Sequence, residues 1–261
     1  KYILKKPLIV RTGYDLLTFS KKNKKSKIKI FFYYLLTKLS VSSSNKYIVS
    51  SSTDYEYIKS INSKNSNKIE IIRNWVNTAK VPEFNKRYID KVISVGRLEK
   101  QKNYKLLIEK FKGSDLTIDL YGEGSMREEL VQFAKKNSVN LNINTPISNK
   151  ELIELLGKYK IFISTSIFEG SPKAILEAMS TGCVVFAKKN ENVMEIIKNK
   201  ENGFIFENQD EIIEEVVNII NNQNDWSHIS SNAVDKVSGK DFTLEGVVEK
   251  EFSIYKELGF S

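Results

Sequence analysis

Residues 162–182, FISTSIFEGSPKAILEAMSTG, read as a buried strand, a short loop and a helix. The apolar run ends before the loop that carries Glu169. Ser171 is a good N-cap residue, Pro172 suits the first helical position, and Gly182 suits the helix exit. This order predicts a helix N-terminus beside the loop, where unpaired N–H groups and the helix dipole favour an anion.

The first turns of this helix carry groups for such a ligand. The amides of Lys173 and Ala174 fall among the N–H groups that have no partner within a helix. Glu177 lies further along, and its side chain is directed back toward the N-terminus. Two interpretations stay open for Glu177. It can pair with Lys173, which contributes about 0.2–0.5 kcal/mol at best, or it can accept both hydroxyls of a ribose.

From Asp90 onward, short β-rich runs alternate with helical periodicities, which predicts βα units and a mostly parallel sheet. The expected strands are 92–95, 116–121, 141–143, 161–166, 184–187 and 203–206, and apolar stripes indicate helices around 126–134, 152–159 and 212–220. A doubly wound sheet of this kind binds ligands at the carboxyl ends of its strands.

The earlier part of the chain follows the same pattern incompletely. Strands are expected at 7–12, 46–50 and 68–72, with helical segments between them. The fold class is therefore α/β, with two Rossmann-like domains of which the N-terminal one is incomplete. The expected division is 1–80 for the partial domain, 81–89 for a linker, 90–240 for the second domain and 241–261 for a C-terminal helix that crosses back to the first domain.

The composition is that of a folded chain, with 41% hydrophobic and 28% charged residues among 261. A single cysteine excludes an internal disulfide framework, and a single histidine, His228, excludes a histidine-rich metal centre. No apolar run reaches the roughly 18–20 residues of a membrane span.

The net charge of +9 is unevenly distributed. Residues 1–88 hold 19 basic and 5 acidic side chains, hence +14, while the remainder is at −5. The excess peaks in the run Lys21–Lys29, directly before the apolar stretch 30–36. The run is interpreted as a solvated loop, as an anchor on anionic lipid, or as a nucleic-acid contact. Because no nucleic-acid-binding signature accompanies it, lipid is favoured over nucleic acid.

Several further motifs occur in a fixed order. They are SVGRL at 94–98 with Lys102 and Asn103, LYGEG at 120–124, IRNWVN at 72–77, and EII at 195–197 with ENGF at 201–204. Together with Glu169 and Glu177, which form a Glu-x₇-Glu pair, this ordered set resembles the retaining glycosyltransferases of the GT-B fold, family 4 in particular. The resemblance covers the chain from about Pro7 to its C-terminus, and the set is far more specific than any one element.

The resemblance implies a role for each matched residue. Arg97 and Lys102 would hold the donor diphosphate, Glu169 would contact the transferred sugar near its reacting carbon, and Glu177 would bind the ribose. The implied catalytic residues are Glu169, Arg97 and Lys102. The implied donor-binding set is Gly96, Arg97, Lys102, Ile147 against the base, Glu169, Gly170, Ser171, Lys173, Ala174 and Glu177.

The sequence also departs from the family pattern. The glycine pair after the fifth strand is replaced by Glu191 and Asn192. On the acceptor side, where many relatives have a histidine, this chain has no histidine. Tyr14 and Asp15 are the candidates there, with turn residues at a strand end as the competing interpretation.

By resemblance, the expected function is retaining transfer of a sugar from a nucleotide-diphosphate sugar to a glycan or lipid-linked acceptor, in cell-surface polysaccharide synthesis. No metal and no cofactor are expected, in keeping with the lack of an Asp-x-Asp pair. The alternative is a non-catalytic fragment that binds a nucleotide sugar or a polyanion. The expected location is cytoplasmic, peripheral on the inner face of the plasma membrane through Lys21–Lys29, without a nucleic-acid partner.

Overall fold

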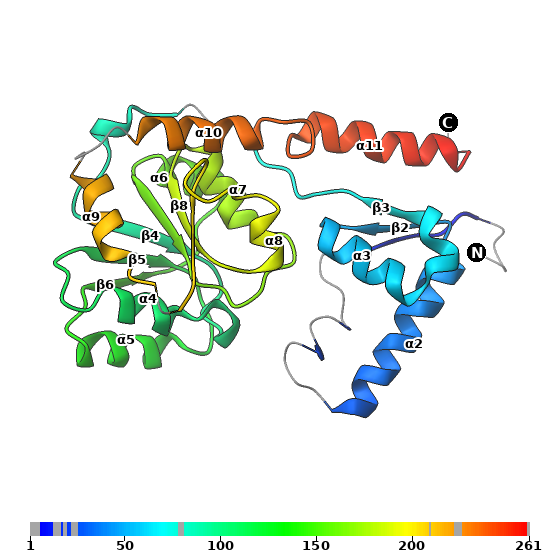
Figure 1. Ribbon diagram of the computed structural model, residues 1–261, viewed down its shortest axis with the longest axis horizontal. Helices are drawn as coiled ribbons and strands as arrows, with labels where there is room; N and C mark the ends of the chain where they lie inside the picture. Colours follow the sequence, from blue (N-terminus) through cyan, green and yellow to red (C-terminus); the bar gives the residue numbers. More distant parts are fainter. Residues whose placement is uncertain are drawn as a thin grey trace. The chain divides into compact units, whose positions relative to one another are not determined.

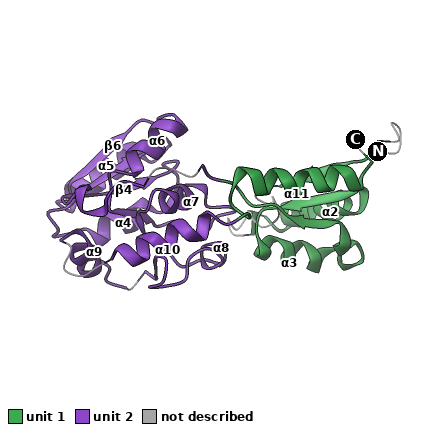
Figure 2. Ribbon diagram, turned by 90° about the horizontal axis from the view of Figure 1, so that it is seen from above, with its two compact units in different colours: residues 1–75, 240–261 green, residues 76–239 purple. Residues whose placement is uncertain are grey.

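The structure, a computed structural model, describes residues 6–12, 17, 20–21, 26–77, 81–208, 210–221 and 226–259. The chain divides into two compact units, coloured separately in Figure 2. Unit 1 consists of Lys1–Trp75 and Lys240–Ser261, and unit 2 consists of Val76–Gly239. Tyr14 and Asp15, the acceptor-side candidates, lie outside the described residues, as does 22–25 of the lysine run.

Unit 1 is built on a parallel sheet whose strand order is β1-β2-β3. Its elements are β1 (Ile9–Arg11), α2 (Lys27–Ser43), β2 (Lys46–Val49), α3 (Ser52–Ile61), a 3₁₀ helix (Ser63–Lys68), β3 (Ile69–Ile71) and α11 (Leu244–Glu257). Because successive side chains of a strand point to opposite faces, β2 contributes to two apolar clusters. Tyr47 and Val49 join the cluster that includes residues of α2 and α3, and Ile48 packs with Val247 and Ile254 of α11.

Unit 2 contains a six-stranded sheet in which every described pairing is parallel (Figure 1). Its strands are β4 (Lys91–Val95), β5 (Thr117–Tyr121), β6 (Leu141–Asn144), β7 (Ile161–Ser164), β8 (Val184–Lys188) and β9 (Phe204–Phe206). Its α-helices are α4 (Tyr104–Lys110), α5 (Arg127–Lys136), α6 (Asn149–Leu156), α7 (Lys173–Ser180), α8 (Glu191–Met194), α9 (Ile213–Ile220) and α10 (Ser227–Val237). Short 3₁₀ helices occur at Phe84–Lys86 and Lys100–Lys102.

Helices cover both faces of this sheet. Figure 1 shows α4 and α5 on one face and α6, α7 and α10 on the other. The central strand β7 is buried along its whole length, which explains why its first three residues, Ile161, Phe162 and Ile163, are all apolar and do not alternate with polar ones. The two layers of helices follow from right-handed crossovers that run in opposite directions from the centre of the sheet.

The predicted strands of unit 2 are confirmed within one or two residues. The helix predicted around 152–159 begins earlier, at Asn149, because Ser148 and Glu151 form a capping box. The segment 81–89, which we expected to be a linker, belongs to unit 2. Its composition is polar, but one of its charged side chains is buried and hydrogen-bonded inside unit 2.

That side chain is Arg87, which is only 4% exposed. Its guanidinium donates hydrogen bonds of 2.8–3.2 Å to the carbonyl oxygens of Pro82, Tyr159, Thr181 and Gly182. Burial lowers the pKa of Arg87 from its ordinary value. A planar fork of donors can satisfy several carbonyls at once, so Arg87 ties this segment to the ends of α6 and α7.

We predict that Arg87→Leu destabilises unit 2 by at least about 3 kcal/mol, because the carbonyls of Tyr159, Thr181 and Pro82 lose the guanidinium donor and an unsatisfied buried group costs about 1–3 kcal/mol. The carbonyl of Gly182 keeps its hydrogen bond from the Ser230 hydroxyl. Urea unfolding followed by circular dichroism measures the change in the free energy of unfolding. The matched control is Lys86→Ala, whose side chain is 74% exposed and forms a surface ion pair with Glu83. Equal effects of the two substitutions would contradict the role of Arg87.

Candidate functional site

The predicted site lies where the strand order of unit 2 reverses direction. From β4 the chain adds β5 and β6 on one side, and it then crosses over to add β7, β8 and β9 on the other. Strands β4 and β7 are therefore neighbours at a topological switch point. Ligands of doubly wound sheets bind outside the carboxyl ends of such strands. The loop after β4 carries Arg97 and Lys102, and the loop after β7 carries Glu169.

An ion pair joins the two loops. The Nζ atom of Lys102 lies 2.6 Å from Oε1 of Glu169, and the side chains are 18% and 12% exposed. Two of the three predicted catalytic side chains are thus in direct contact. Because both side chains are largely shielded from water, the attraction between the two charges is stronger than in a pair on an open surface.

Main-chain groups hold the same loops together. The amide of Ile167 donates to the carbonyl of Gln101 at 2.9 Å, and Nε2 of Gln101 donates to the carbonyl of Phe168 at 2.8 Å. The hydroxyl of Thr165 donates to the carbonyl of Lys102 at 2.8 Å. These bonds fix the backbone on both sides of the ion pair, so its geometry is set by the fold as well as by charge.

Close packing of two turns sets the start of the loop after β4. The amide of Gly96 donates to the carbonyl of Tyr121 at 3.0 Å. A Cβ atom on Gly122 would lie 1.9 Å from the carbonyl oxygen of Gly96, so glycine is required at 122. The glycines of the LYGEG motif therefore let the turn after β5 support the loop that carries Arg97.

Arg97 is exposed at this edge of the sheet. Among the residues that the structure describes, its guanidinium has no ion-pair partner, unlike the ammonium group of Lys102. Arg97 therefore offers this edge of the sheet a positive charge that no ion pair among the described residues neutralises. Such an edge suits an anionic ligand.

Tyr104 is a neighbour that the sequence interpretation did not include. It begins α4, directly after the loop with Lys102, and is 4% exposed. Burial, and next the negative charge of Glu169, raise the pKa of Tyr104. Its hydroxyl therefore stays protonated beside the ion pair. The sequence offered no signal for it, because a tyrosine at a helix start reads as an ordinary core residue.

Glu177 is almost fully buried, with 5% exposure. Its Oε1 accepts a hydrogen bond of 2.6 Å from Nδ2 of Asn149 and lies 3.7 Å from Nζ of Lys173. The pairing with Lys173 that the spacing allowed is therefore present, but it is long, and the shorter contact is to Asn149. Burial is the largest influence on this carboxyl, and it raises the pKa of Glu177 above its ordinary value.

The predicted start of α7 needs a correction. Ser171 was expected to cap the helix and Pro172 to be its first residue, whereas the helix begins at Lys173 and Pro172 is the N-cap. Pro172 has φ −76° and ψ 72°, so its backbone has not entered the helix. The amide of Lys173 donates to the carbonyl of Ser171 at 2.8 Å and is not available to a ligand. The amide of Ala174 has no main-chain acceptor within the described residues.

Asn192, one of the two residues that replace the family's glycine pair, holds the loop of Glu169 in place. Its Nδ2 donates to the carbonyls of Glu169 and Gly170, each at 2.6 Å. The side chain is 6% exposed. The sequence shows that Asn192 departs from the family pattern at this position. It does not show which groups Asn192 contacts, because the glycine of the family pattern has no side chain with which to compare it.

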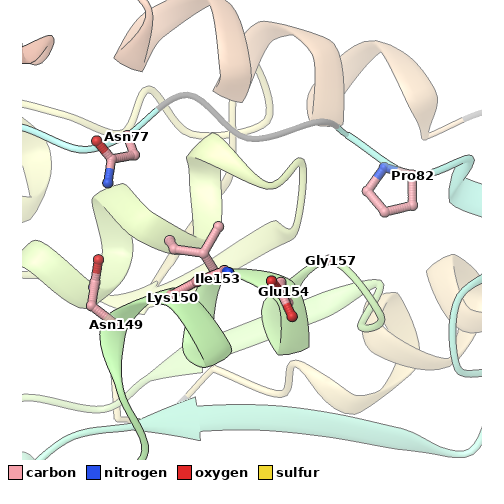
Figure 3. A pocket seen from close by; sticks show the side chains of 7 residues that line it. All are labelled: Asn77, Pro82, Asn149, Lys150, Ile153, Glu154 and Gly157. Carbon is pink, nitrogen blue, oxygen red and sulfur yellow. The ribbon is translucent and has the colours of Figure 1, made fainter.

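A cavity of about 500 Å³ lies beside α6 within unit 2 (Figure 3). Its lining residues are Asn77, Pro82, Asn149, Lys150, Ile153, Glu154 and Gly157. None of the predicted donor-binding residues lines it. Asn149 lines the cavity and also donates a hydrogen bond to Glu177. Ile147, the predicted contact to the base, is 37% exposed and lies two residues before the start of α6.

The family model for glycosyl transferases group 1 matches residues 77–236, which is most of unit 2. The chain belongs to the group 1 glycosyl transferases. Its structure has the GT-B fold, as expected from the motifs at 94–98, 120–124 and 169–177. Of the residues that the motifs singled out after β4 and β7, Lys102 and Glu169 are in direct contact in the structure.

Two curated relatives illustrate the range of similar sequences. The chain is 27% identical to N-acetylgalactosamine-N,N'-diacetylbacillosaminyl-diphospho-undecaprenol 4-alpha-N-acetylgalactosaminyltransferase of Campylobacter jejuni, over 44% of this chain and 33% of that protein. It is 23% identical to poly(ribitol-phosphate) alpha-N-acetylglucosaminyltransferase of Staphylococcus aureus, over 62% of this chain and 34% of that protein. The chain thus spans about a third of the length of these relatives.

Solved structures share the fold at low identity. Anabaena Alr3699/HepE in complex with UDP and glucose is 18% identical, with a TM-score of 0.80 over 98% of this chain and 73% of that one. The pneumococcal O-GlcNAc transferase GtfA in complex with UDP and GlcNAc is 19% identical, with a TM-score of 0.69 over 87% of this chain and 48% of that one.

Two kinds of feature are absent from the described residues. No group of three or more His, Cys, Asp or Glu side chains gathers there in a way that could hold a metal ion. No helix in the described part of the chain has both the length and the apolar character that crossing a membrane requires.

We predict that Glu177→Gln stabilises the protein at neutral pH. A carboxyl whose native pKa is raised binds its proton more tightly in the folded than in the unfolded chain, so its ionisation lowers stability as pH rises. The effect grows as pH rises above the ordinary glutamate pKa of about 4.3 and disappears as pH falls below it. The amide of Gln can still accept the bond from Asn149.

Thermal unfolding of the variant and the wild type, measured between about pH 4 and pH 8, tests this. The matched control is Glu154→Gln, an exposed glutamate of α6. A gain in melting temperature that does not change with pH, or that the control reproduces, would show that ionisation of Glu177 is not the cause.

Proposed function

We propose that this chain carries the donor-binding part of a retaining glycosyltransferase. The enzyme would move a sugar from a nucleotide-diphosphate sugar to a glycan or lipid-linked acceptor. The observation that carries the proposal is the arrangement at the switch point, where the Lys102–Glu169 ion pair, exposed Arg97 and buried Glu177 occupy one unit of a group 1 glycosyl transferase.

The substrate classes are supported by the relatives. Two of them are named for diphospho-undecaprenol acceptors, the Campylobacter jejuni enzyme and an Escherichia coli galactosyltransferase that is 30% identical over 55% of this chain. Another acts on poly(ribitol-phosphate). Both solved neighbours described above hold UDP. We therefore propose a UDP-sugar donor and an acceptor of the cell-surface glycan class.

The charges of the site suit a departing nucleotide diphosphate. Arg97 offers a planar fork of donors that matches two phosphate oxygens, and Lys102 offers a compact charge. Lys102 is neutralised by Glu169 at 2.6 Å. When a diphosphate approaches Lys102, Glu169 is free to turn to the sugar. One well-placed donor of this type can lower a barrier by about 2.7–4 kcal/mol.

The proposed reaction needs neither a metal ion nor a strong protein base. Arg97 and Lys102 stabilise the negative charge that develops on the leaving group. The acceptor hydroxyl attacks on the face that the nucleotide leaves, and its proton passes to a phosphate oxygen of the leaving group. The sugar therefore keeps its anomeric configuration. Glu177, with one carboxylate oxygen bonded to Asn149, has its other oxygen for the ribose.

We predict that Glu169→Gln and Arg97→Ala each lower sugar transfer more than tenfold while the fold is retained. Glu169→Gln leaves Lys102 without its counter-charge, and Arg97→Ala removes the exposed fork from the diphosphate site. Transfer from a radiolabelled UDP-sugar is measured, together with UDP binding by calorimetry.

The matched control is Lys100→Ala, which removes an exposed lysine from the same 3₁₀ helix as Lys102. If both site variants kept wild-type transfer, the proposed function would be wrong. If UDP bound without any transfer or donor hydrolysis in the wild type, the non-catalytic interpretation would replace it.

Asn192 gives an independent prediction. Asn192→Ala removes the two bonds that hold the backbone at Glu169 and Gly170, and we expect a larger fall in kcat than in UDP affinity, because the sugar contact moves while the diphosphate contacts remain. Asn202→Ala is the matched control, since Asn202 is 4% exposed and also donates to a main-chain carbonyl, away from the site. Equal losses of kcat in both variants would indicate a general loss of stability.

A further inference from the structure

Helix α2 of unit 1 has an exposed apolar face. In sequence it is KIKIFFYYLLTKLSVSS, and apolar residues recur along one side at intervals of three and four. We call this side the apolar stripe, and its members are Ile28, Phe31, Phe32, Leu35, Leu36 and Leu39. The four most exposed of them are between 58% and 82% accessible, a degree that is unusual for such large side chains on one helix face.

The opposite side of α2 is already used by the fold. Val41 is fully buried, and Ile30, Tyr33 and Tyr34 pack against the same core cluster as the sheet of unit 1. Figure 1 shows the amino-terminal half of α2 extending beyond strands β1–β3. The packed side fixes how the helix is rotated, so the apolar stripe must face away from this cluster.

Lysines border the stripe on both sides. At 100° per residue, Lys27 and Lys38 lie along one border of the stripe and Lys29 lies along the other, and all three are exposed. The helix contains no acidic residue. A broad apolar face bordered by lysines suits contact with a membrane interface, because the lysine stems can lie along the apolar surface while their charges stay in water.

We propose that the apolar stripe of α2 docks on an anionic lipid bilayer. The phenylalanine and leucine side chains enter the boundary between headgroups and acyl chains, and Lys27, Lys29 and Lys38 contact the anionic headgroups on either side. A second copy of the same face fits less well, because two α2 helices would bring lysines against lysines without any acid to compensate them.

The experiment is co-sedimentation of the 261-residue chain with vesicles. One vesicle preparation contains equal parts phosphatidylglycerol and phosphatidylcholine, and the other contains phosphatidylcholine alone. We expect binding to the anionic vesicles that weakens with added salt, and much weaker binding to the neutral ones. Lys27→Gln with Lys29→Gln should weaken anionic binding by about thirtyfold.

The stripe itself is tested with Phe31→Ser and Phe32→Ser combined, which should reduce vesicle binding at least tenfold without changing the circular dichroism spectrum. The matched control is Phe252→Ser on α11, which removes a phenylalanine of the same exposure, 61% against 63% for Phe31. Lys135→Gln with Lys136→Gln, on α5 of unit 2, controls for the loss of two positive charges.

Other outcomes would overturn the proposal. Equal binding of the stripe variant and the Phe252 variant would show that α2 does not enter the lipid. A wild-type dimer in light scattering that the stripe variant converts to a monomer, without vesicle binding by either, would show that a second copy covers the face. The readout is independent of sugar transfer, so it can fail or succeed whatever the enzyme's activity.

Discussion

The ion pair of Lys102 and Glu169 is the contact on which the site depends. The two residues follow different strands and are 67 positions apart in the sequence, yet their charged atoms lie 2.6 Å apart. A pair that is this well shielded is costly to break, because removing one partner leaves the other charge uncompensated in a low dielectric. An anion that approaches Lys102 provides that compensation itself. In the proposed reaction, a negatively charged ligand at Lys102 would release Glu169 to contact the sugar.

Neutral amides hold the two acids of the site in place. Asn149 donates to the carboxylate of Glu177, and Asn192 donates to the backbone at Glu169. An amide does not titrate, so these contacts persist while the acids change their charge. Glu177 illustrates why such support is needed. Its burial raises the pKa of the carboxyl, and a carboxyl whose pKa is shifted by burial is typical of a functional position.

The alternation of apolar runs and helical stripes was sufficient to predict the parallel sheet of unit 2, because each pattern reflects local periodicity. The motifs likewise predicted that Lys102 and Glu169 share a site, since parallel strands end at one edge. The predicted start of α7 was wrong. Ser171 and Pro172 are residue types that favour a helix start, but the backbone of Pro172 is not helical. Asn149 and Asn192 could not be found, because each acts on residues more than twenty positions away and nothing local marks the contact. The contact of Ile147 with a base stays a prediction.

The division of the chain has a consequence for its synthesis. Unit 2 is one continuous segment, Val76–Gly239, whereas unit 1 is completed by a helix encoded after it. Ile48 and Ile72 are covered by Val247 and Ile254, so one face of the first sheet stays bare until α11 has left the ribosome. Unit 2 can fold before α11 packs on the first sheet. Contacts between segments so far apart in the sequence form slowly. During this interval the nascent chain exposes an apolar sheet surface, and transiently exposed surface of this kind favours aggregation.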